Sequence, residues 1–313
     1  MGEIGIMRKF IVLITVLLSS CSPSGEPTSV FLDPSRNRSI DYQVWIPEES
    51  IGIRPLVLLS HGSGGDYTNH KWLINALVAN DYIVAAPNHP FNTTRDNTDK
   101  GVISVWDRPL DISLLLDHLL ADPELSILID ETRIGATGFS SGGYTVIALG
   151  GASYDRELMS NYCNSIDHGP DCELASDDTD VDYSNSALSY KDSRIKAIFS
   201  MAPAVGAAIT KASLESIEIP VYIIAAVDDE LAYPAYNAIH YADNIPDSNL
   251  EMLPSGGHFI FLECNFATHI ADWFIDELDL CGNEFSVDRP QVRGKVAAEA
   301  VAFFNQSIGD ISP

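Results

Sequence analysis

Short apolar runs alternate along this chain with longer amphipathic stretches. The apolar runs lie near residues 42–46, 56–60, 83–87, 133–139, 195–201, 221–227 and 250–254. The amphipathic, helix-like stretches lie near residues 70–80, 109–121, 141–150, 233–243, 265–277 and 294–306. Because the apolar runs are short and nearly continuous, they are typical of strands buried on both faces of a sheet. The alternation predicts an α/β fold with a mostly parallel, doubly wound sheet and helices on both faces.

Size and composition predict one large domain. The chain has 313 residues, of which 46% are hydrophobic, and this is enough for a single sizeable core. We expect the domain over residues 33–308, with a polar, acidic insertion at 161–192. No internal repeat is evident.

A short motif stands where a strand-like run meets a helix-like one. Residues 138–142 read Gly-Phe-Ser-Ser-Gly, which is the Gly-x-Ser-x-Gly pattern in a strand–turn–helix context. Such a turn lifts the hydroxyl of Ser140 clear of the sheet through strained backbone dihedrals. Gly138 and Gly142 flank it because a larger side chain would collide across the turn. The motif predicts that Ser140 is a nucleophile.

A glycine-rich loop follows an earlier apolar run. Residues 61–65 read His-Gly-Ser-Gly-Gly, and such a loop lets backbone N–H groups approach a ligand closely. In an acyl-transfer enzyme, this loop and the residue after the nucleophile supply the two donors of an oxyanion hole. We therefore assign these donors to the N–H groups of Ser63 and Ser141. The alternative is an ordinary βα turn that needs glycine.

Two adjacent aspartates follow the run at 221–227. A carboxylate at the end of a strand can accept a hydrogen bond from a catalytic imidazole and fix its tautomer. We prefer Asp229, because the acid usually lies three residues after a small residue at the strand end, here Ala226. Asp228 is the alternative.

One histidine is placed to act with this acid. His258 follows the last apolar run and a glycine pair that lets the loop swing it back towards Ser140. The chain order is then Ser, Asp, His. The remaining histidines are expected to be solvated or packed. His89 is a partial exception, since its loop opens on the same side of the sheet and could line the pocket, although a packing role is favoured.

Ser140, Asp229 and His258, together with the loop at 61–65, resemble the α/β-hydrolase superfamily. Within it, the chain is similar to bacterial lipoprotein relatives of platelet-activating-factor acetylhydrolase, often labelled predicted dienelactone hydrolases. The likeness covers roughly residues 30–306 and is carried by the stretches 33–38, 42–47, 60–65, 106–111 and 257–262.

The predicted triad fits a serine esterase that needs no cofactor and acts on short-chain acyl esters. The resemblance implies phospholipid-type esters with a short acyl chain. Dienelactone hydrolases use a cysteine nucleophile, whereas the residue here is Ser140, so ester hydrolysis fits better. A serine peptidase with the same triad is one alternative, although a separate N-terminal domain that would sieve peptides is not evident. A non-catalytic surface lipoprotein is the other, but a binding role has no need of the strained serine turn.

The N-terminus resembles that of a bacterial lipoprotein. Arg8 and Lys9 precede an apolar stretch at 11–18 that is too short to remain as a membrane span. Small residues then lead to Cys21, as in a lipobox. We expect residues 1–20 to be a signal peptide, Cys21 to be lipidated and 21–32 to form a tether. The protein would be exported and lipid-anchored in the cell envelope; an ordinary signal peptide is the alternative.

Four further cysteines fit an oxidising compartment. Cys163 and Cys172 are close in sequence, as are Cys264 and Cys281, so these two pairs are the expected disulfides among three possible pairings. A metal site is disfavoured because the spacings match no zinc pattern.

The net charge limits the possible partners. The formal charge is −26, and no basic patch is visible, so nucleic acid is excluded as a partner. An anionic membrane surface would also repel the domain, which leaves the lipid as its anchor. Much of the excess lies at Asp167, Asp171, Glu173, Asp177, Asp178, Asp180 and Asp182. Their spacing matches no EF-hand loop, so a solvated insertion is favoured over a Ca²⁺ site. In α/β-hydrolases this region often forms a cap, so it could border the pocket.

Overall fold

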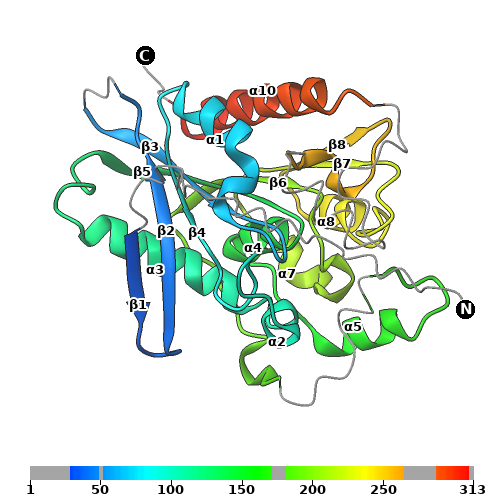
Figure 1. Cartoon of the computed structure of the whole chain (residues 1–313). Coiled ribbons are helices and arrows are strands. Elements are labelled where there is room, and N and C mark those ends of the chain that lie inside the picture. The colour runs from blue at the N-terminus through cyan, green and yellow to red at the C-terminus, as the bar shows by residue number, and fades with distance from the viewer. Residues whose placement is uncertain (1–28, 49–51, 171, 173–180, 264–286, 310–313) are drawn as a thin grey trace, which may run out of the picture.

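The computed structural model describes residues 29–48, 52–170, 172, 181–263 and 287–309. An eight-stranded sheet in the order β1-β2-β4-β3-β5-β6-β7-β8 runs through the centre of the molecule (Figure 1). The strands are β1 (Ser29–Asp33), β2 (Arg38–Trp45), β3 (Arg54–Ser60), β4 (Ile83–Pro87), β5 (Ile129–Phe139), β6 (Ile195–Met201), β7 (Val221–Ala226) and β8 (Ser248–Leu253). The β1–β2 and β2–β4 pairs are antiparallel, and the others are parallel. The predicted α/β fold is confirmed.

Helices cover both faces of this sheet. Their bounds are α1 (Lys71–Val78), α2 (Asp99–Ile103), α3 (Asp107–Ala121), α4 (Ser141–Gly150), α5 (Arg156–Cys163), α7 (Lys211–Glu215), α8 (Ala238–Asn244) and α10 (Arg289–Ile308). Short 3₁₀ helices lie at Tyr67–His70, Tyr183–Asn185, Gly206–Ala208 and His258–Phe261. Helices α1 and α10 lie together on one face, while α3, α4 and α8 pack into the core on the other (Figure 1).

The register of the two central strands positions the site. In β3 all residues but the first are buried, as expected for a strand with helices on both sides. The parallel ladder between β3 and β5 pairs Ser60 with Gly138. The loop after β3 and the turn after β5 therefore start side by side at the carboxyl edge of the sheet, where ligands bind in folds of this kind.

The boundary predicted between tether and domain is wrong. Residues 29–32 were expected in the tether, but they belong to β1, which pairs antiparallel with β2. Phe31 is buried and lies against the rings of Tyr42 and His118, with centroid distances of 5.8 and 5.4 Å. Ser29, Val30 and Leu32 face solvent, and the apolar run at 30–32 is only three residues long, so this strand does not stand out from the polar segment before it.

The predicted helix at 233–243 begins later than expected. Pro234 opens a turn, and α8 starts only at Ala238. The side-chain carbonyl of Asn237 accepts a hydrogen bond from the N–H of Gly206 at 2.8 Å, and its amide donates to the Tyr233 carbonyl at 3.1 Å. These bonds hold the turn in a non-helical form.

The acidic insertion is more closely packed than predicted. Helix α5 extends into it, and Val181 and Tyr190 are buried in the main core. The ring centroids of Tyr183 and Trp106 lie 5.1 Å apart, and the guanidinium of Arg156 lies 4.0 Å from the centroid of the Tyr183 ring. The end of the insertion is therefore part of the domain. Of its acidic residues, Asp171, Glu173, Asp177, Asp178 and Asp180 lie outside the described residues.

Cys163 and Cys172 form a disulfide, which is the first of the two expected pairs. Cys264 and Cys281 lie outside the described residues, as do the predicted lipidation site Cys21 and the predicted helix at 265–277. No helix within the described ranges is long and apolar enough to cross a membrane.

A buried histidine should make the fold sensitive to acid. His70 is fully buried against the Phe139 ring, and burial lowers the pKa of its imidazole from 6.5 to about 4. In the unfolded chain the same group titrates near 6.5. Between these values the unfolded state binds more protons, so stability falls as the pH falls. The shift corresponds to about 3 kcal/mol of unfolding free energy lost between pH 6.5 and 4.

We expect the His70→Phe variant to lose less stability than the parent between pH 7 and pH 5. Urea unfolding at each pH measures this difference. The control is His168→Phe, at an exposed position, which should keep the parent's acid sensitivity. Equal pH dependence in the parent and in His70→Phe would contradict the prediction.

Candidate active site

Ser140 occupies a sharp turn between β5 and α4. Its backbone has φ 56° and ψ −121°, a conformation that costs free energy for any residue other than glycine. Its N–H donates to the Met201 carbonyl at 2.9 Å, and its carbonyl accepts from the Tyr144 and Ala204 N–H groups, both at 3.1 Å. These bonds to the end of β6 and to α4 maintain the strained turn.

The two flanking glycines are required by close backbone approach. A Cβ on Gly138 would collide with the backbone of Gly142. A Cβ on Gly142 would collide with the Ser60 carbonyl and lie 2.7 Å from that of His61. The turn therefore presses against the end of β3, which brings Ser140 close to the loop at 61–65.

Three predicted site residues form one hydrogen-bonded row. The Ser140 hydroxyl oxygen lies 2.9 Å from Nε2 of His258, and Nδ1 of His258 lies 2.8 Å from Oδ2 of Asp229. Because a carboxylate can only accept, Nδ1 carries the proton and Nε2 is left to accept from the serine. All three side chains are buried, and Ser140 keeps 9% of its surface exposed.

The structure distinguishes between the two adjacent aspartates. Asp228 is exposed, whereas Asp229 is buried against His258. The second oxygen of Asp229, Oδ1, accepts from the N–H groups of Leu231 at 3.1 Å and Ala232 at 2.7 Å. These two bonds fix the carboxylate so that Oδ2 faces the imidazole.

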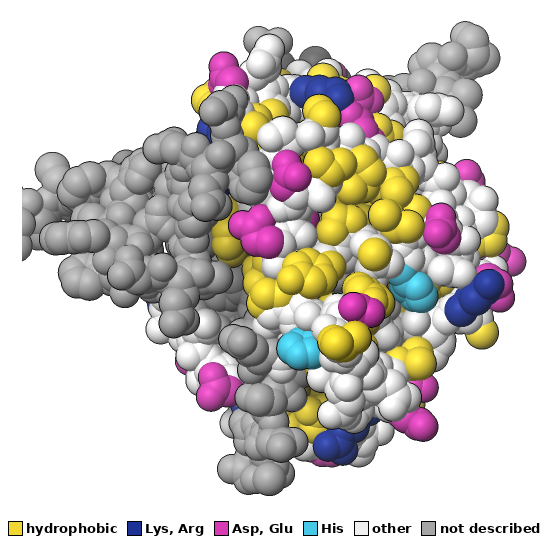
Figure 2. Space-filling model, turned by 90° about the vertical axis from the view of Figure 1, so that its right-hand side faces the viewer, with side chains coloured by type: hydrophobic (Ala, Val, Ile, Leu, Met, Phe, Trp, Pro, Cys, Tyr) yellow, Lys and Arg dark blue, Asp and Glu magenta, His cyan; other side chains and the backbone are white. Residues whose placement is uncertain are grey.

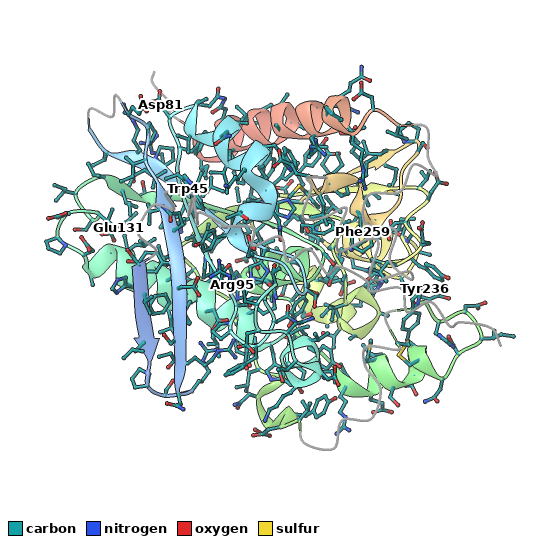
Figure 3. All side chains as sticks on the ribbon, in the orientation of Figure 1. Trp45, Asp81, Arg95, Glu131, Tyr236 and Phe259 are labelled. Carbon is teal, nitrogen blue, oxygen red and sulfur yellow. A yellow bond between two sulfur atoms is a disulfide. The ribbon has the colours of Figure 1, made fainter. Side chains whose placement is uncertain are left out.

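Aromatic rings pack around the imidazole of His258. The Phe139 ring lies 4.9 Å away on one side, and Phe259 makes an edge contact at 5.2 Å. Figure 3 shows Phe259 at the end of β7 and β8. These rings limit the movement of His258 and keep water away from its hydrogen bonds.

Two backbone N–H groups beside the nucleophile are available as donors. Ser141 is the first residue of α4, where N–H groups have no partner inside the helix. Within the described residues, neither the Ser141 N–H nor the Ser63 N–H donates a hydrogen bond. Both belong to segments that the β3–β5 register brings together. The arrangement can therefore hold a negatively charged oxygen.

A second Ser–His–Asp row lies behind the first. The Ser60 hydroxyl lies 2.9 Å from Nε2 of His89, and Nδ1 of His89 lies 2.9 Å from Oδ2 of Asp111. All three side chains have no exposed surface. A substrate cannot reach Ser60, so this row is structural. The expectation that His89 packs rather than lines the pocket agrees with its burial.

His89 of this second row and the neighbouring His61 are neutral at physiological pH. Burial lowers the pKa of His89 well below its usual value, and Arg108 adds to the effect. The same two causes lower the pKa of His61. Nε2 of His61 accepts from the His89 N–H at 3.0 Å, so its Nδ1 carries the proton and donates to the Gly62 carbonyl at 2.7 Å.

Buried and half-buried arginines lie around Asp111. Arg36 and Arg38 donate to its carboxylate at 2.7 and 3.1 Å. Burial raises the pKa of Asp111, and these two guanidinium groups counteract the rise. Arg108 is also buried, which lowers its pKa to about 9, so it remains charged at neutral pH. Sequence reasoning gave none of these residues a role.

Helix α5, at the start of the insertion, packs against the loops that follow β6 and β7. The Ala208 carbonyl accepts from the N–H of Asp155 at 2.7 Å, just before α5. Tyr162 on α5 packs against Tyr236, with ring centroids 4.8 Å apart, and Figure 3 shows Tyr236 beside the disulfide of this segment.

The face turned forward in Figure 2 carries a broad area of apolar side chains among scattered acidic ones.

The described residues contain no group of three or more His, Cys, Asp or Glu side chains arranged to bind a metal ion.

Comparison with known proteins shows the fold. The chain is similar to a ferulic acid esterase from Streptomyces cinnamoneus, with a TM-score of 0.60, 19% identity and coverage of 91% of this chain and 90% of that one. It is also similar to a dienelactone hydrolase from Anabaena variabilis, with a TM-score of 0.52, 14% identity and coverage of 90% and 99%. No family model and no curated protein sequence matches the chain. At these identities the likeness establishes an α/β-hydrolase fold, and the narrower resemblance to acetylhydrolase relatives stays a prediction.

Proposed function

We propose that this protein is a serine hydrolase that cleaves carboxylic esters. The observation that carries the proposal is the row of Ser140, His258 and Asp229, with distances of 2.9 and 2.8 Å, beside two unengaged backbone donors. A nucleophile, a base and an oriented carboxylate in this geometry can perform acyl transfer without a cofactor.

In the first half of the reaction, the Ser140 hydroxyl oxygen attacks the ester carbonyl while Nε2 of His258 takes its proton. The carbonyl electron pair moves onto oxygen, and the N–H groups of Ser63 and Ser141 stabilise that oxyanion. Collapse of the tetrahedral intermediate breaks the bond to the alcohol, which takes the proton from His258. An acyl-serine remains.

In the second half, water replaces the alcohol. His258 removes a proton from the water as it attacks the acyl-serine, and returns the proton to Ser140 when the carboxylic acid leaves. Asp229 keeps the imidazole in the same tautomer and stabilises its charged form in both halves. The same two donors hold the oxyanion each time.

A serine peptidase is the second candidate, because amide cleavage uses the same groups. Side-by-side assays of p-nitrophenyl acetate and aminoacyl p-nitroanilides would separate the two. We expect the ester to be cleaved and the anilide not. A p-nitrophenyl series with longer acyl chains would then define which esters fit.

We expect a fluorophosphonate probe to label the protein on Ser140 and to spare Ser60. Both serines have a histidine partner, but Ser140 is 9% exposed whereas Ser60 has no exposed surface. Peptide mapping by mass spectrometry locates the phosphonate. Labelling of the Ser60 peptide, or no labelling of the folded protein, would contradict the proposed function.

A further inference from the structure

The buried side-chain amide of Asn92 makes two hydrogen bonds to the loop that carries Ser63. Its side-chain carbonyl accepts from the Gly64 N–H at 3.1 Å, and its NH₂ donates to the Ser63 hydroxyl at 3.0 Å. Asn92 is 2% exposed and lies in the segment between β4 and α2. A side chain from a distant part of the chain thus contacts two consecutive residues of the loop.

Arg108 holds this amide in place. Its Nη1 donates to the Asn92 carbonyl oxygen at 2.9 Å, and its Nη2 donates to the His61 carbonyl at the start of the same loop. Its Nε donates to the Thr145 hydroxyl at 3.2 Å, on the helix that begins beside the nucleophile. Arg108 therefore connects Asn92, the loop and α4 as one unit.

The bonds around Ser63 determine the direction of its N–H. This group belongs to the planar peptide unit that also contains the Gly62 carbonyl. That carbonyl accepts from Nδ1 of His61 at 2.7 Å and from the Gly65 N–H at 3.1 Å. Hydrogen bonds within the loop therefore hold the oxygen of this peptide unit. On the other side of its nitrogen, Asn92 holds the Ser63 hydroxyl and the Gly64 N–H. The Ser63 N–H remains without an acceptor among the described residues.

We propose that Asn92 is a positioning residue that aims the Ser63 N–H at the oxyanion, with Arg108 holding Asn92 in place. The inference rests on the proposed function and adds to it the residues that fix the direction of one oxyanion donor. Without Asn92, the Ser63 side chain and the Gly64 N–H lose their partners, and the peptide can rotate about its remaining anchor. A donor stabilises an oxyanion only when its direction is fixed before the reaction.

Loss of the Asn92 side chain should weaken binding of the transition state and leave binding of the substrate nearly unchanged. Loss of one oxyanion donor lowers kcat by roughly 100- to 1,000-fold, so a misdirected donor should lower it by about 10- to 100-fold. The KM for p-nitrophenyl acetate should stay within about 2-fold, because the neutral ester carbonyl binds the donor weakly. The inhibition constant of a trifluoromethyl ketone, which forms an oxyanion on Ser140, should rise in parallel with the loss of kcat/KM.

The test compares Asn92→Ala with Asn88→Ala. Asn88 also makes two hydrogen bonds, from the Tyr67 N–H at 3.0 Å and to Asp41 at 2.7 Å, but neither contacts the loop at 61–65. We expect Asn92→Ala to show these effects and Asn88→Ala to stay within about 3-fold of the parent, as for a substitution outside the oxyanion site.

Ser63→Ala provides a second variant if Asn92→Ala does not fold. It keeps the backbone N–H and removes only the acceptor of the Asn92 amide, so about a 3- to 10-fold loss of kcat with a parallel rise in the inhibition constant is expected. A folded Asn92→Ala variant with parental kcat, or one whose ketone affinity is unchanged, would overturn the proposal. A parent that does not turn over esters, or does so without Ser140, would instead reject the proposed function.

Discussion

Ser140→Ala should lower kcat for p-nitrophenyl acetate by about 10,000-fold or more while the protein stays folded. In the proposed mechanism, the substitution removes the oxygen atom that forms the acyl-enzyme and leaves His258 without its serine partner. Alanine tolerates the φ of 56° no worse than serine does, and the bonds that maintain the turn involve only the backbone of Ser140. Circular dichroism and the thermal midpoint should therefore match those of the parent.

The control for this variant is Ser160→Ala, at an exposed position on α5, which should retain parental turnover. Residual activity of Ser140→Ala must be distinguished from contaminating esterase, and titration with the fluorophosphonate probe does so. Turnover by Ser140→Ala within 10-fold of the parent, with no labelled contaminant, would mean that another group attacks the ester.

Much of the candidate site could be predicted because its residues lie in short local patterns. Ser140 lies on a sharp turn between a strand and a helix, and the glycines on either side of it identify that turn in the sequence. Asp229 and His258 each follow a recognisable apolar run, and parallel strands bring their carboxyl ends to one edge. Local pattern and overall topology agree here, so the prediction needs no long-range information.

The polar groups behind the site could not be predicted in this way. Asn92 and Arg108 meet the loop at 61–65 only after folding. One signal was nevertheless present, since Arg108 and Asp111 share a helix face with the apolar residues Ile112 and Leu115. Charged side chains on the buried face of an amphipathic helix indicate a buried polar network.

The errors at element boundaries have similar causes. Strand β1 is short, and three of its five residues face solvent, so its pattern is weak beside the Pro- and Ser-rich segment that precedes it. The late start of α8 depends on the bond between Asn237 and Gly206, which lies far away in sequence. In both places a tertiary contact decides the outcome, and local propensity does not encode it.

Asp229→Asn should lower kcat by about 10,000-fold, because it reverses the tautomer of the imidazole. Oδ1 of Asp229 accepts from the Leu231 and Ala232 N–H groups, so in the variant the amide oxygen keeps that position. The NH₂ group then takes the place of Oδ2 and points at Nδ1 of His258. Nδ1 must accept from it, so the proton moves to Nε2, which can no longer take a proton from Ser140.

Asp228→Asn is the matched control, because it makes the same chemical change one residue earlier on an exposed side chain. We expect its kcat to stay within about 2-fold of the parent, since an exposed carboxylate contributes little. Both variants should fold like the parent, because the amide keeps the two backbone bonds at position 229. A large loss in Asp228→Asn with little loss in Asp229→Asn would assign the acid to the other aspartate. Equal, small losses would mean that the imidazole does not need a carboxylate to orient it.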